Sequence, residues 1–262
     1  MLERMKDPQK AADIFGEWQD TILWSCLQDV MGDVLVTEEG ENASSAAAWL
    51  GDFCLLGGTP DRRLIDGIFS RMREKGQEFL ILVPKDETWS DMIETGLGDH
   101  ARRIVRYAIK KEPGIFDRKR LEQAVLAVGD GFELSLIDRR LYEACLAEGW
   151  SRDLVSQFVE YESFRRLGLG VAALRDGKPV SGASSYSRYR EGIEIEIDTK
   201  PEYRRKGLAY ACGAKLILEC MDRGLYPSWD AQNPASVALA EKLGYHFDRE
   251  YTAYEVFCRE EG

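Results

Sequence analysis

The residues of this chain that could do chemistry are concentrated in 193–209, IEIEIDTKPEYRRKGLA. Isoleucines alternate there with Glu194, Glu196 and Asp198, so the pattern predicts a strand with apolar side chains on one face and carboxylates on the other. Pro201 ends the strand, and a basic run then leads into the next helix. The carboxylates could take up protons, and a basic strand-to-helix turn could hold a phosphate.

The predicted helix start suits an anion for two reasons. Its first backbone N–H groups have no partners inside the helix, and the helix dipole places about half a positive elementary charge there. Gly207 and the small Ala209, with Leu208 between them, would let a pyrophosphate approach this backbone closely. The alternative is a solvated basic turn that binds nothing, since short motifs have many false positives. In either case Arg204, Arg205 and Lys206 place three full positive charges just before the helix start.

These residues resemble the pyrophosphate loop of the GNAT superfamily of acetyl-coenzyme A-dependent N-acetyltransferases, which reads Q/R-x-x-G-x-G/A. Arg204, Gly207 and Ala209 stand at its defined positions. A second segment, NPASVALAEKLGY at 233–245, is similar to the asparagine-led helix and LGF/Y ending of the same family. The amino-acid sequences of both segments are similar to those of the GNAT branch that includes the zwittermicin A resistance acetyltransferase. The part of the chain that carries the resemblance is 130–258.

The resemblance implies where acetyl-coenzyme A (acetyl-CoA) would be held. Members of the family polarise the thioester carbonyl with backbone N–H groups at a point where two strands splay apart, which implies Ile197, Asp198 and Thr199. Asn233 and Ser236 open the second segment and are implied to lie at the cofactor as well. Because a proline follows Asn233, the residues themselves favour a helix cap there over a contact with the pantetheine arm.

Acetyl transfer to an amine also requires a group that accepts the amine's proton. Glu194 and Glu196 share the polar face of the predicted strand, and Glu196 is nearer the expected thioester, so it is the first candidate for the base. Asp230, just after a predicted strand at 226–229, is a third carboxylate expected at the same cleft. The alternative is that both glutamates are ordinary solvent-facing residues of a half-exposed sheet.

The group that would protonate the coenzyme A thiolate is not evident from the sequence. The family often uses a tyrosine seven residues after the helix-leading asparagine, and Ala240 stands at that position here. Water, Tyr245 or another group would then supply the proton. Other chemistries lack their residues, because the two histidines are not near a nucleophile motif and no zinc-ligand spacing, P-loop or G-x-G-x-x-G pattern occurs.

Composition limits the class of protein and its partners. With 262 residues and 44% hydrophobic residues the chain can form one large or two modest cores. A net charge of −11 argues against nucleic acid and anionic membranes as partners and suits a cationic acceptor. No apolar run reaches the ~18 residues of a membrane span, and no signal-peptide core is evident, so we expect a cytoplasmic protein. The six cysteines are scattered singly and are expected to be buried thiols.

The order of predicted elements indicates an α+β fold with α/β/α layers. The C-terminal half is expected to hold a mixed, mostly antiparallel GNAT-type sheet, and the N-terminal half, smaller and α+β, repeats part of the same order. Residues 59–64 echo the strand-to-helix turn without its glycine, so the N-terminal half could be a degenerate copy, although any α+β half-domain could show this order. The expected domains are 1–128 and 129–262. The expected elements include a long strand at 46–58, a helix at 152–159 and two closing strands at 245–248 and 252–258.

Two functions from different classes follow. The first is an acetyl-CoA-dependent transferase that acetylates a primary amine of a small molecule, such as an aminopolyol antibiotic or a polyamine-like metabolite, by direct attack in a ternary complex. In this hypothesis the protein is a monomer or homodimer, uses no metal, and its N-terminal half shapes the acceptor pocket. The second is a non-catalytic acyl-CoA-binding or interaction protein that kept the cofactor loop and lost its proton-transfer groups.

Overall fold

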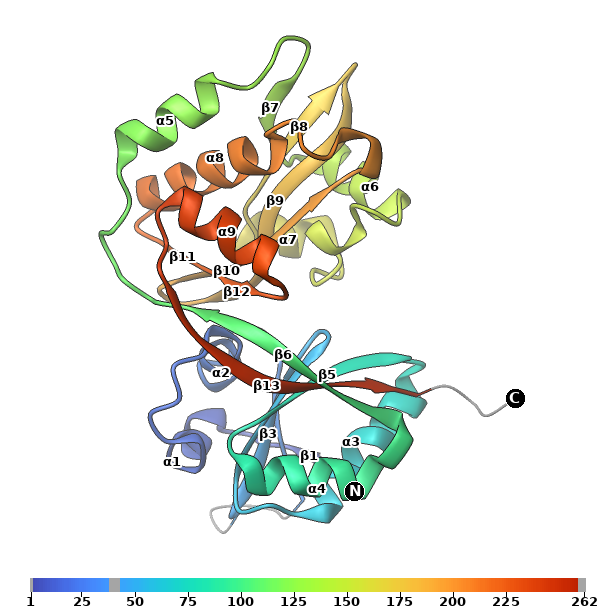
Figure 1. The fold of residues 1–262 in the computed structure, drawn as a ribbon. Helices are drawn as coiled ribbons and strands as arrows, with labels where there is room; N and C mark the ends of the chain where they lie inside the picture. The colour runs from blue at the N-terminus through green and yellow to red at the C-terminus, as the bar shows by residue number, and fades with distance from the viewer. Residues whose placement is uncertain (1, 38–42, 259–262) are drawn as a thin grey trace. The chain divides into compact units, whose positions relative to one another are not determined.

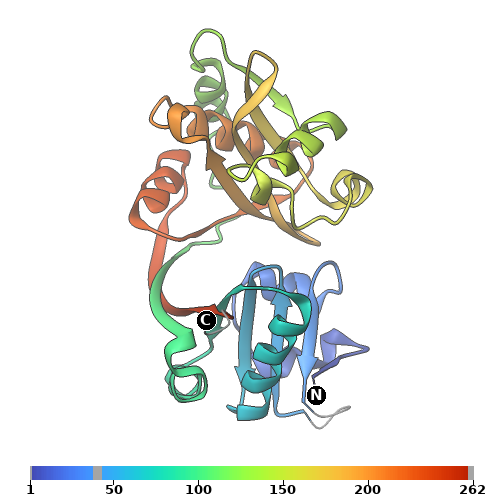
Figure 2. The same ribbon diagram turned by 90° about the vertical axis from the view of Figure 1, so that its right-hand side faces the viewer.

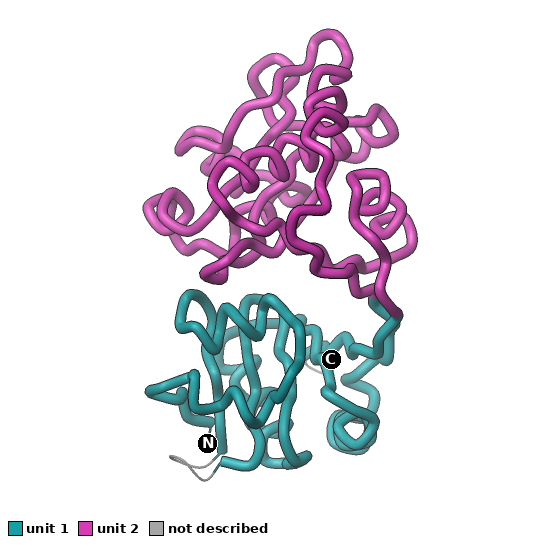
Figure 3. Tube along the Cα trace, turned by 90° about the vertical axis from the view of Figure 1, so that its left-hand side faces the viewer, with its two compact units in different colours: residues 1–106, 250–262 teal, residues 107–249 magenta. Residues whose placement is uncertain are grey.

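The computed structural model describes residues 2–37 and 43–258, which form two compact units (Figure 3). Unit 1 comprises residues 1–106 and 250–262, and unit 2 comprises residues 107–249. The chain passes between the units in strands β6 (Ala101–Ile109) and β13 (Phe247–Phe257). The division differs from the predicted boundary at 128/129, since residues 107–128 belong to unit 2. The last residues of the chain belong to unit 1 because β13 pairs there with β5 (Phe79–Pro84). In the described part of the chain, no helix has the length and apolar character needed to span a membrane.

Unit 1 is built on a sheet whose strands follow the order β1-β2-β3-β4-β5-β13-β6 (Figure 1). Strands β4 and β5 are parallel and α3 joins them, whereas β1 to β4 pair with one another antiparallel. The C-terminal strand β13 therefore completes the sheet of the N-terminal unit. The bounds are β1 Glu3–Arg4, η1 Pro8–Ala11, α1 Ala12–Phe15, α2 Thr21–Leu27, β2 Asp33–Val36, β3 Ser45–Leu50, β4 Phe53–Gly58, α3 Arg62–Lys75, α4 Glu87–Leu97 and η2 Gly98–His100.

The predicted single strand at 46–58 is wrong, because the structure forms a hairpin of β3 and β4 there. Leu50 lies opposite Phe53, and Gly51 adopts a φ of 56° in the turn between them. A two-residue turn with positive φ matches the twist of a hairpin. Both strands are almost wholly buried, so their continuous apolar pattern concealed the turn.

Unit 2 contains a five-stranded sheet in the order β11-β10-β9-β8-β7, in which only the β10–β11 pair is parallel. Helices α5 and α8 lie on one face of this sheet and α6 and α7 on the other (Figures 1 and 2). The predicted layered, mostly antiparallel α+β fold is thus confirmed. The bounds are α5 Arg118–Leu126, β7 Glu133–Leu136, α6 Arg139–Ala147, η3 Arg152–Leu154, α7 Tyr161–Leu167, β8 Gly170–Arg175, β9 Lys178–Tyr189, β10 Gly192–Thr199, η4 Pro201–Tyr203, α8 Leu208–Asp222, β11 Tyr226–Ser228, β12 Asp230–Ala231 and α9 Pro234–Leu243.

Three local predictions for the C-terminal half of the sequence need correction. The predicted helix at 152–159 is only the 3-10 turn η3, since a short turn already buries Leu154, Val155 and Phe158. Helices α5 and α7 were not predicted. The two closing strands are one continuous strand, β13.

Helix α8 supplies much of the unit 2 core. Nine of its fifteen residues are buried, among them Cys212 and Cys220. Burial raises the pKa of both thiols to about 12, so they stay protonated and behave as small apolar groups. The prediction of buried free thiols is confirmed for five of the six cysteines, and Cys258 is half-buried.

Candidate active site

Strand β10 loses its neighbour on one side halfway along its length. It pairs with β9 from Gly192 to Thr199, but with β11 only at Gly192, Ile193 and Glu194. Strand β11 ends at Ser228, and the next strand, β12, pairs with β6 instead. The sheet therefore opens beside the second half of β10, the splay that the family resemblance implied.

The ladder between β10 and β9 determines which backbone amides face this opening. The N–H of Lys200 donates to the carbonyl of Val180 at 3.0 Å. Because amides alternate in direction along an antiparallel strand, the N–H groups of Ile197 and Thr199 point away from β9 and into the opening. That of Thr199 donates to the Asp198 carboxylate at 3.0 Å, which leaves Ile197 as the best placed donor for a carbonyl oxygen.

The loop after β10 leads into helix α8, whose first backbone amides are not covered by a capping side chain. Gly207 is the N-cap of α8 with a φ of 79°, and no side chain caps this helix. A Cβ atom at Gly207 would meet nothing within 4 Å. Arg205 also has a positive φ, 62°, and the guanidinium of Arg204 donates to the Thr199 carbonyl at 3.3 Å. Arg204, Arg205 and Lys206 are all exposed just before the first-turn amides of α8. Open backbone amides beside cations are what a pyrophosphate requires.

The corresponding turn of unit 1 is closed by its own side chain. Asp61 is the N-cap of α3, and its carboxylate accepts the N–H of Arg63 at 2.8 Å. It also bonds the Arg63 guanidinium and the Thr37 hydroxyl. Although burial acts to raise it, these hydrogen bonds hold the pKa of Asp61 below its usual value. A carboxylate therefore occupies the place at α3 that is open at α8.

Three predicted carboxylates lie on β10, and the fourth does not. Glu194 is 6% exposed, whereas Glu196 and Asp198 are half-buried. Burial raises the pKa of Asp198, and the negative charge of Asp153 on η3 adds to that rise. Asp230 lies on β12 opposite Ala108 of β6, across the opening from β10. The three β10 carboxylates thus share one strand, whereas Asp230 lies on a strand that pairs with β6.

The second motif performs a structural task. Asn233 caps α9 by accepting the N–H of Ser236 at 2.9 Å, the role that the residues themselves favoured. The Ser236 hydroxyl in turn accepts the indole N–H of Trp229. Both predicted cofactor residues are therefore already bonded within the protein.

The two candidate positions for a tyrosine acid are unsuitable. Ala240 is fully buried on α9. The hydroxyl of Tyr245 donates to the Pro227 carbonyl at 2.7 Å, and the side chain is 2% exposed. Burial raises the pKa of Tyr245 well above its usual value, so the phenol keeps its proton. That proton lies in the hydrogen bond to Pro227 and does not face the opening.

One contact at the site was missed by sequence reasoning. Lys200, which follows β10, forms an ion pair of 3.1 Å with Glu148 at the end of α6, and the indole N–H of Trp150 donates to the same carboxylate at 2.7 Å. These hydrogen bonds lower the pKa of Glu148. No local pattern could reveal the pair, because its members lie 52 residues apart.

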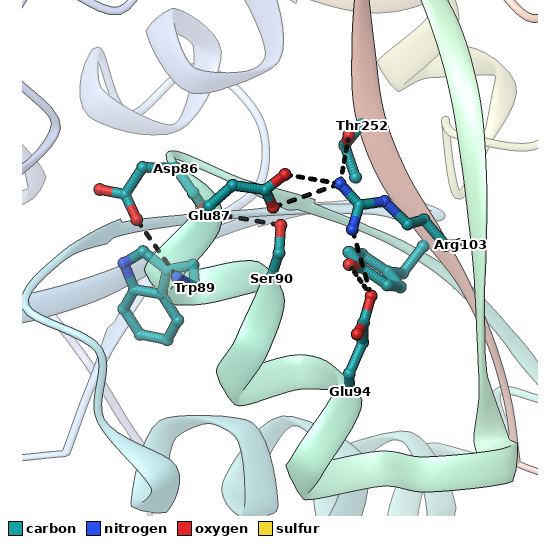
Figure 4. Close-up of polar contacts among 8 residues, drawn as sticks. Asp86, Glu87, Trp89, Ser90, Glu94, Arg103 and Thr252 are labelled. Atoms are coloured by element: carbon teal, nitrogen blue, oxygen red, sulfur yellow. Dashed lines mark hydrogen bonds and ion pairs between the residues drawn. The ribbon is translucent and has the colours of Figure 1, made fainter.

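A second polar cluster, in unit 1, has a structural explanation. Arg103 of β6 bonds Glu87 and Glu94 of α4 and Thr252 of β13 (Figure 4). Its hydrogen bond to Glu87 lowers the pKa of that carboxyl. The ion pairs are exposed and each contributes little stability, and the contacts connect β6 with α4 and β13.

Comparisons with known proteins agree with this geometry. A family model for GNAT acetyltransferases matches residues 12–254. The Uncharacterized N-acetyltransferase YdfB of Bacillus subtilis (strain 168) is 31% identical over 199 residues, 72% of this chain and 70% of that protein. The crystal structure of a GCN5-related N-acetyltransferase-like protein from Streptococcus suis 89/1591 has a TM-score of 0.88 and 47% identity, over 96% of this chain and 98% of that chain. A tandem GNAT protein from the clavulanic acid biosynthesis pathway shares the fold, with a TM-score of 0.59 and 12% identity over 100% of both chains.

The fold and these matches define the class of protein as an N-acetyltransferase. The chain belongs to the GNAT acetyltransferase family, whose members generally use acetyl-CoA. Its two units, each with a parallel strand–helix–strand segment, fit a tandem arrangement of that fold.

Proposed function

We propose that this protein transfers the acetyl group of acetyl-CoA to a primary amine of a small molecule, by direct attack in a ternary complex. The observation that carries the proposal is the position of the uncapped start of α8 directly after the strand that opens at the splay. A cofactor with a pyrophosphate at one end and a thioester at the other suits both features. Acetyl-CoA supplies the acetyl group as an activated thioester.

The residues around the helix start would hold the cofactor. The amides of Leu208 and Ala209 and the cations before them would bind the pyrophosphate. The backbone at 197–199 would receive the pantetheine arm and the carbonyl, with the Ile197 N–H as the donor aimed into the opening. Asn233 and Ser236 would shape this region through the start of α9 rather than by direct bonds, because each already has a partner.

Proton transfer is assigned to the carboxylates of β10. Glu196 is the proposed base, since it is half-buried on the open half of the strand and can face an acceptor. Glu194 and Asp230 are the second and third candidates. In the net reaction an ammonium group and a thioester give an amide, a thiol and one proton, and the thiolate can take its proton from water.

The acceptor is proposed to be a small cationic amine. Glu196, Asp198 and the nearby Asp153 concentrate negative charge beside the opening, within a chain of net charge −11. An aminopolyol, as the resemblance to the zwittermicin A resistance branch suggests, or a polyamine-like metabolite has this charge. We propose a cytoplasmic protein that acts as a monomer or homodimer.

A second candidate function is acyl-CoA binding without catalysis. It is favoured because position 240 is an alanine and the hydroxyl of Tyr245 is buried in a bond to Pro227, so neither position supplies an acid. The two are separated by two measurements on the wild-type protein. Calorimetry with acetyl-CoA is expected to give one site per chain, because Asp61 closes the equivalent turn of unit 1. A thiol-release assay with a panel of amines is expected to find turnover, and binding without turnover on every amine would favour the second function.

A further inference from the structure

A lysine of α9 lies over an aromatic ring in the first turn of α8. The Nζ atom of Lys242 is 4.1 Å from the centroid of the Tyr210 ring. Tyr210 is the third residue of α8 and directly follows Ala209, the last residue of the pyrophosphate pattern. A full positive charge from a second helix is therefore held at the turn that carries the open amides.

Packing between α8 and α9 determines where the Lys242 backbone lies. Gly213, three residues after Tyr210, leaves room for Leu243, since a Cβ atom at Gly213 would lie 2.9 Å from the Cδ1 atom of Leu243. The Arg120 guanidinium donates to the Lys242 carbonyl at 2.8 Å and so holds the end of α9. These contacts involve neighbours and the backbone of Lys242, so they leave its ammonium group free to bind something else.

The ammonium group of Lys242 is accessible and keeps its charge. The side chain is exposed, and within residues 2–37 and 43–258 it forms no ion pair with a carboxylate. Lys200 and Lys215 of the same unit are, by contrast, paired with glutamates. An exposed cation–π contact contributes only about 0.5–1 kcal/mol, so the Tyr210 ring orients the ammonium without neutralising it. An oriented lysine with three N–H donors suits a phosphate.

Coenzyme A carries two separate anionic groups. The pyrophosphate is already served by the amides of Leu208 and Ala209 and by the three cations of the preceding loop. The second group is the phosphate on the 3′ oxygen of the ribose, and the same ribose carries the pyrophosphate on its 5′ oxygen. A cation that binds this phosphate must therefore lie close to the pyrophosphate site, and Lys242 meets that requirement from a different element.

We propose that Lys242 binds the 3′-phosphate of coenzyme A and that Tyr210 positions the Lys242 ammonium for this contact. The inference rests on the proposed function and adds a preference for coenzyme A over 3′-dephospho-coenzyme A. Lys242 is the residue that determines this specificity, and Tyr210 is a positioning residue. The contact is non-covalent and takes no part in acetyl transfer.

The first test is a calorimetric comparison of coenzyme A with 3′-dephospho-coenzyme A, which differ only in this phosphate. The wild-type protein is expected to bind coenzyme A about tenfold more tightly. Lys242→Met keeps the length of the side chain and removes its charge, so it should weaken coenzyme A binding about tenfold and leave the Kd for the dephospho form within about twofold. Lys242→Arg should retain the preference. An equal loss for both ligands would assign Lys242 to the pyrophosphate and overturn the proposal.

The second test separates the role of Tyr210 from general effects of charge. Tyr210→Phe keeps the ring under the ammonium and should keep the preference, whereas Tyr210→Leu should reduce it. Lys119→Met is the matched control, because Lys119 is exposed on α5 and its neighbour Arg118 pairs with Asp222 at the far end of α8. The control should change neither Kd, and a loss of preference there would overturn the assignment to Lys242.

The same measurements distinguish this inference from the proposed function. A wild-type protein that binds both ligands with equal affinity overturns the 3′-phosphate contact alone. A wild-type protein that binds neither ligand overturns the proposed function as well, because the cofactor would then have no site.

Discussion

The indole N–H of Trp229 donates a hydrogen bond of 3.1 Å to the hydroxyl of Ser236. Trp229 is 5% exposed and follows β11, and Ser236 lies in the first turn of α9. The bond connects the start of α9 to Trp229, which lies between β11 and β12 where the chain turns away from β10. One hydrogen bond thus connects the second family motif to the geometry of the opening.

Replacement of Ser236 tests this connection. Ser236→Ala leaves the buried indole N–H without its partner, so we expect the free energy of unfolding to fall by about 1–3 kcal/mol. Urea unfolding followed by tryptophan fluorescence measures the change. Ser236→Thr keeps the hydroxyl and serves as the control. Equal stability of the alanine variant and the wild type would mean that the bond is not formed in solution.

A side chain at Gly207 should block the cofactor. Gly207→Val places a branched side chain in the open space at the start of α8, so we expect the Kd for acetyl-CoA in calorimetry to rise by about tenfold or more. The matched control is Gly224→Val, because Gly224 also has a positive φ, 65°, and open space around it, at the other end of α8. Similar affinities for the two variants would exclude this loop as the pyrophosphate site.

Glu196→Gln should separate catalysis from binding. The amide keeps the size of the side chain but cannot accept the amine's proton, so kcat is expected to fall by about 100-fold while the Kd for acetyl-CoA stays unchanged. Glu133→Gln, on the exposed edge strand β7 of the same sheet, is the control. Wild-type turnover in the Glu196 variant would remove it as the base and direct attention to Glu194.

Tyr245→Phe should leave turnover intact. The phenol bonds the Pro227 carbonyl and is buried, so its loss is expected to lower the free energy of unfolding by about 1 kcal/mol without changing kcat. Thermal unfolding and the thiol-release assay measure the two quantities. A large fall in kcat at unchanged stability would identify Tyr245 as the acid after all.

The Asp61 cap should stabilise unit 1 in a pH-dependent manner. Asp61→Ala removes the N-cap of α3, with an expected loss of about 1 kcal/mol at pH 7 and no effect on acetyl-CoA affinity. The folded pKa of Asp61 lies below its unfolded value of about 3.9, so the contribution is full above that value and disappears as the pH falls through the folded pKa. Urea titrations of both proteins at several pH values check this. A difference that persists at the lowest pH would show that the carboxylate charge is not responsible.

The sequence by itself determined the features that depend on neighbours along the chain. The alternation at 193–198 defined β10, Gly207 marked the start of α8, and Asn233 with Pro234 marked the cap of α9. Each rests on backbone conformation or on hydrogen bonds within a few residues, which local residue types control. The family followed from two such segments in the right order.

Only the tertiary structure decided what depends on pairing between distant segments. The return of β13 to β5 placed the end of the chain in unit 1, and the pairing of β12 with β6 opened the sheet beside Ile197. Pairing over long separations is determined by the packing of whole sheets, and no local pattern encodes which strand will be the neighbour.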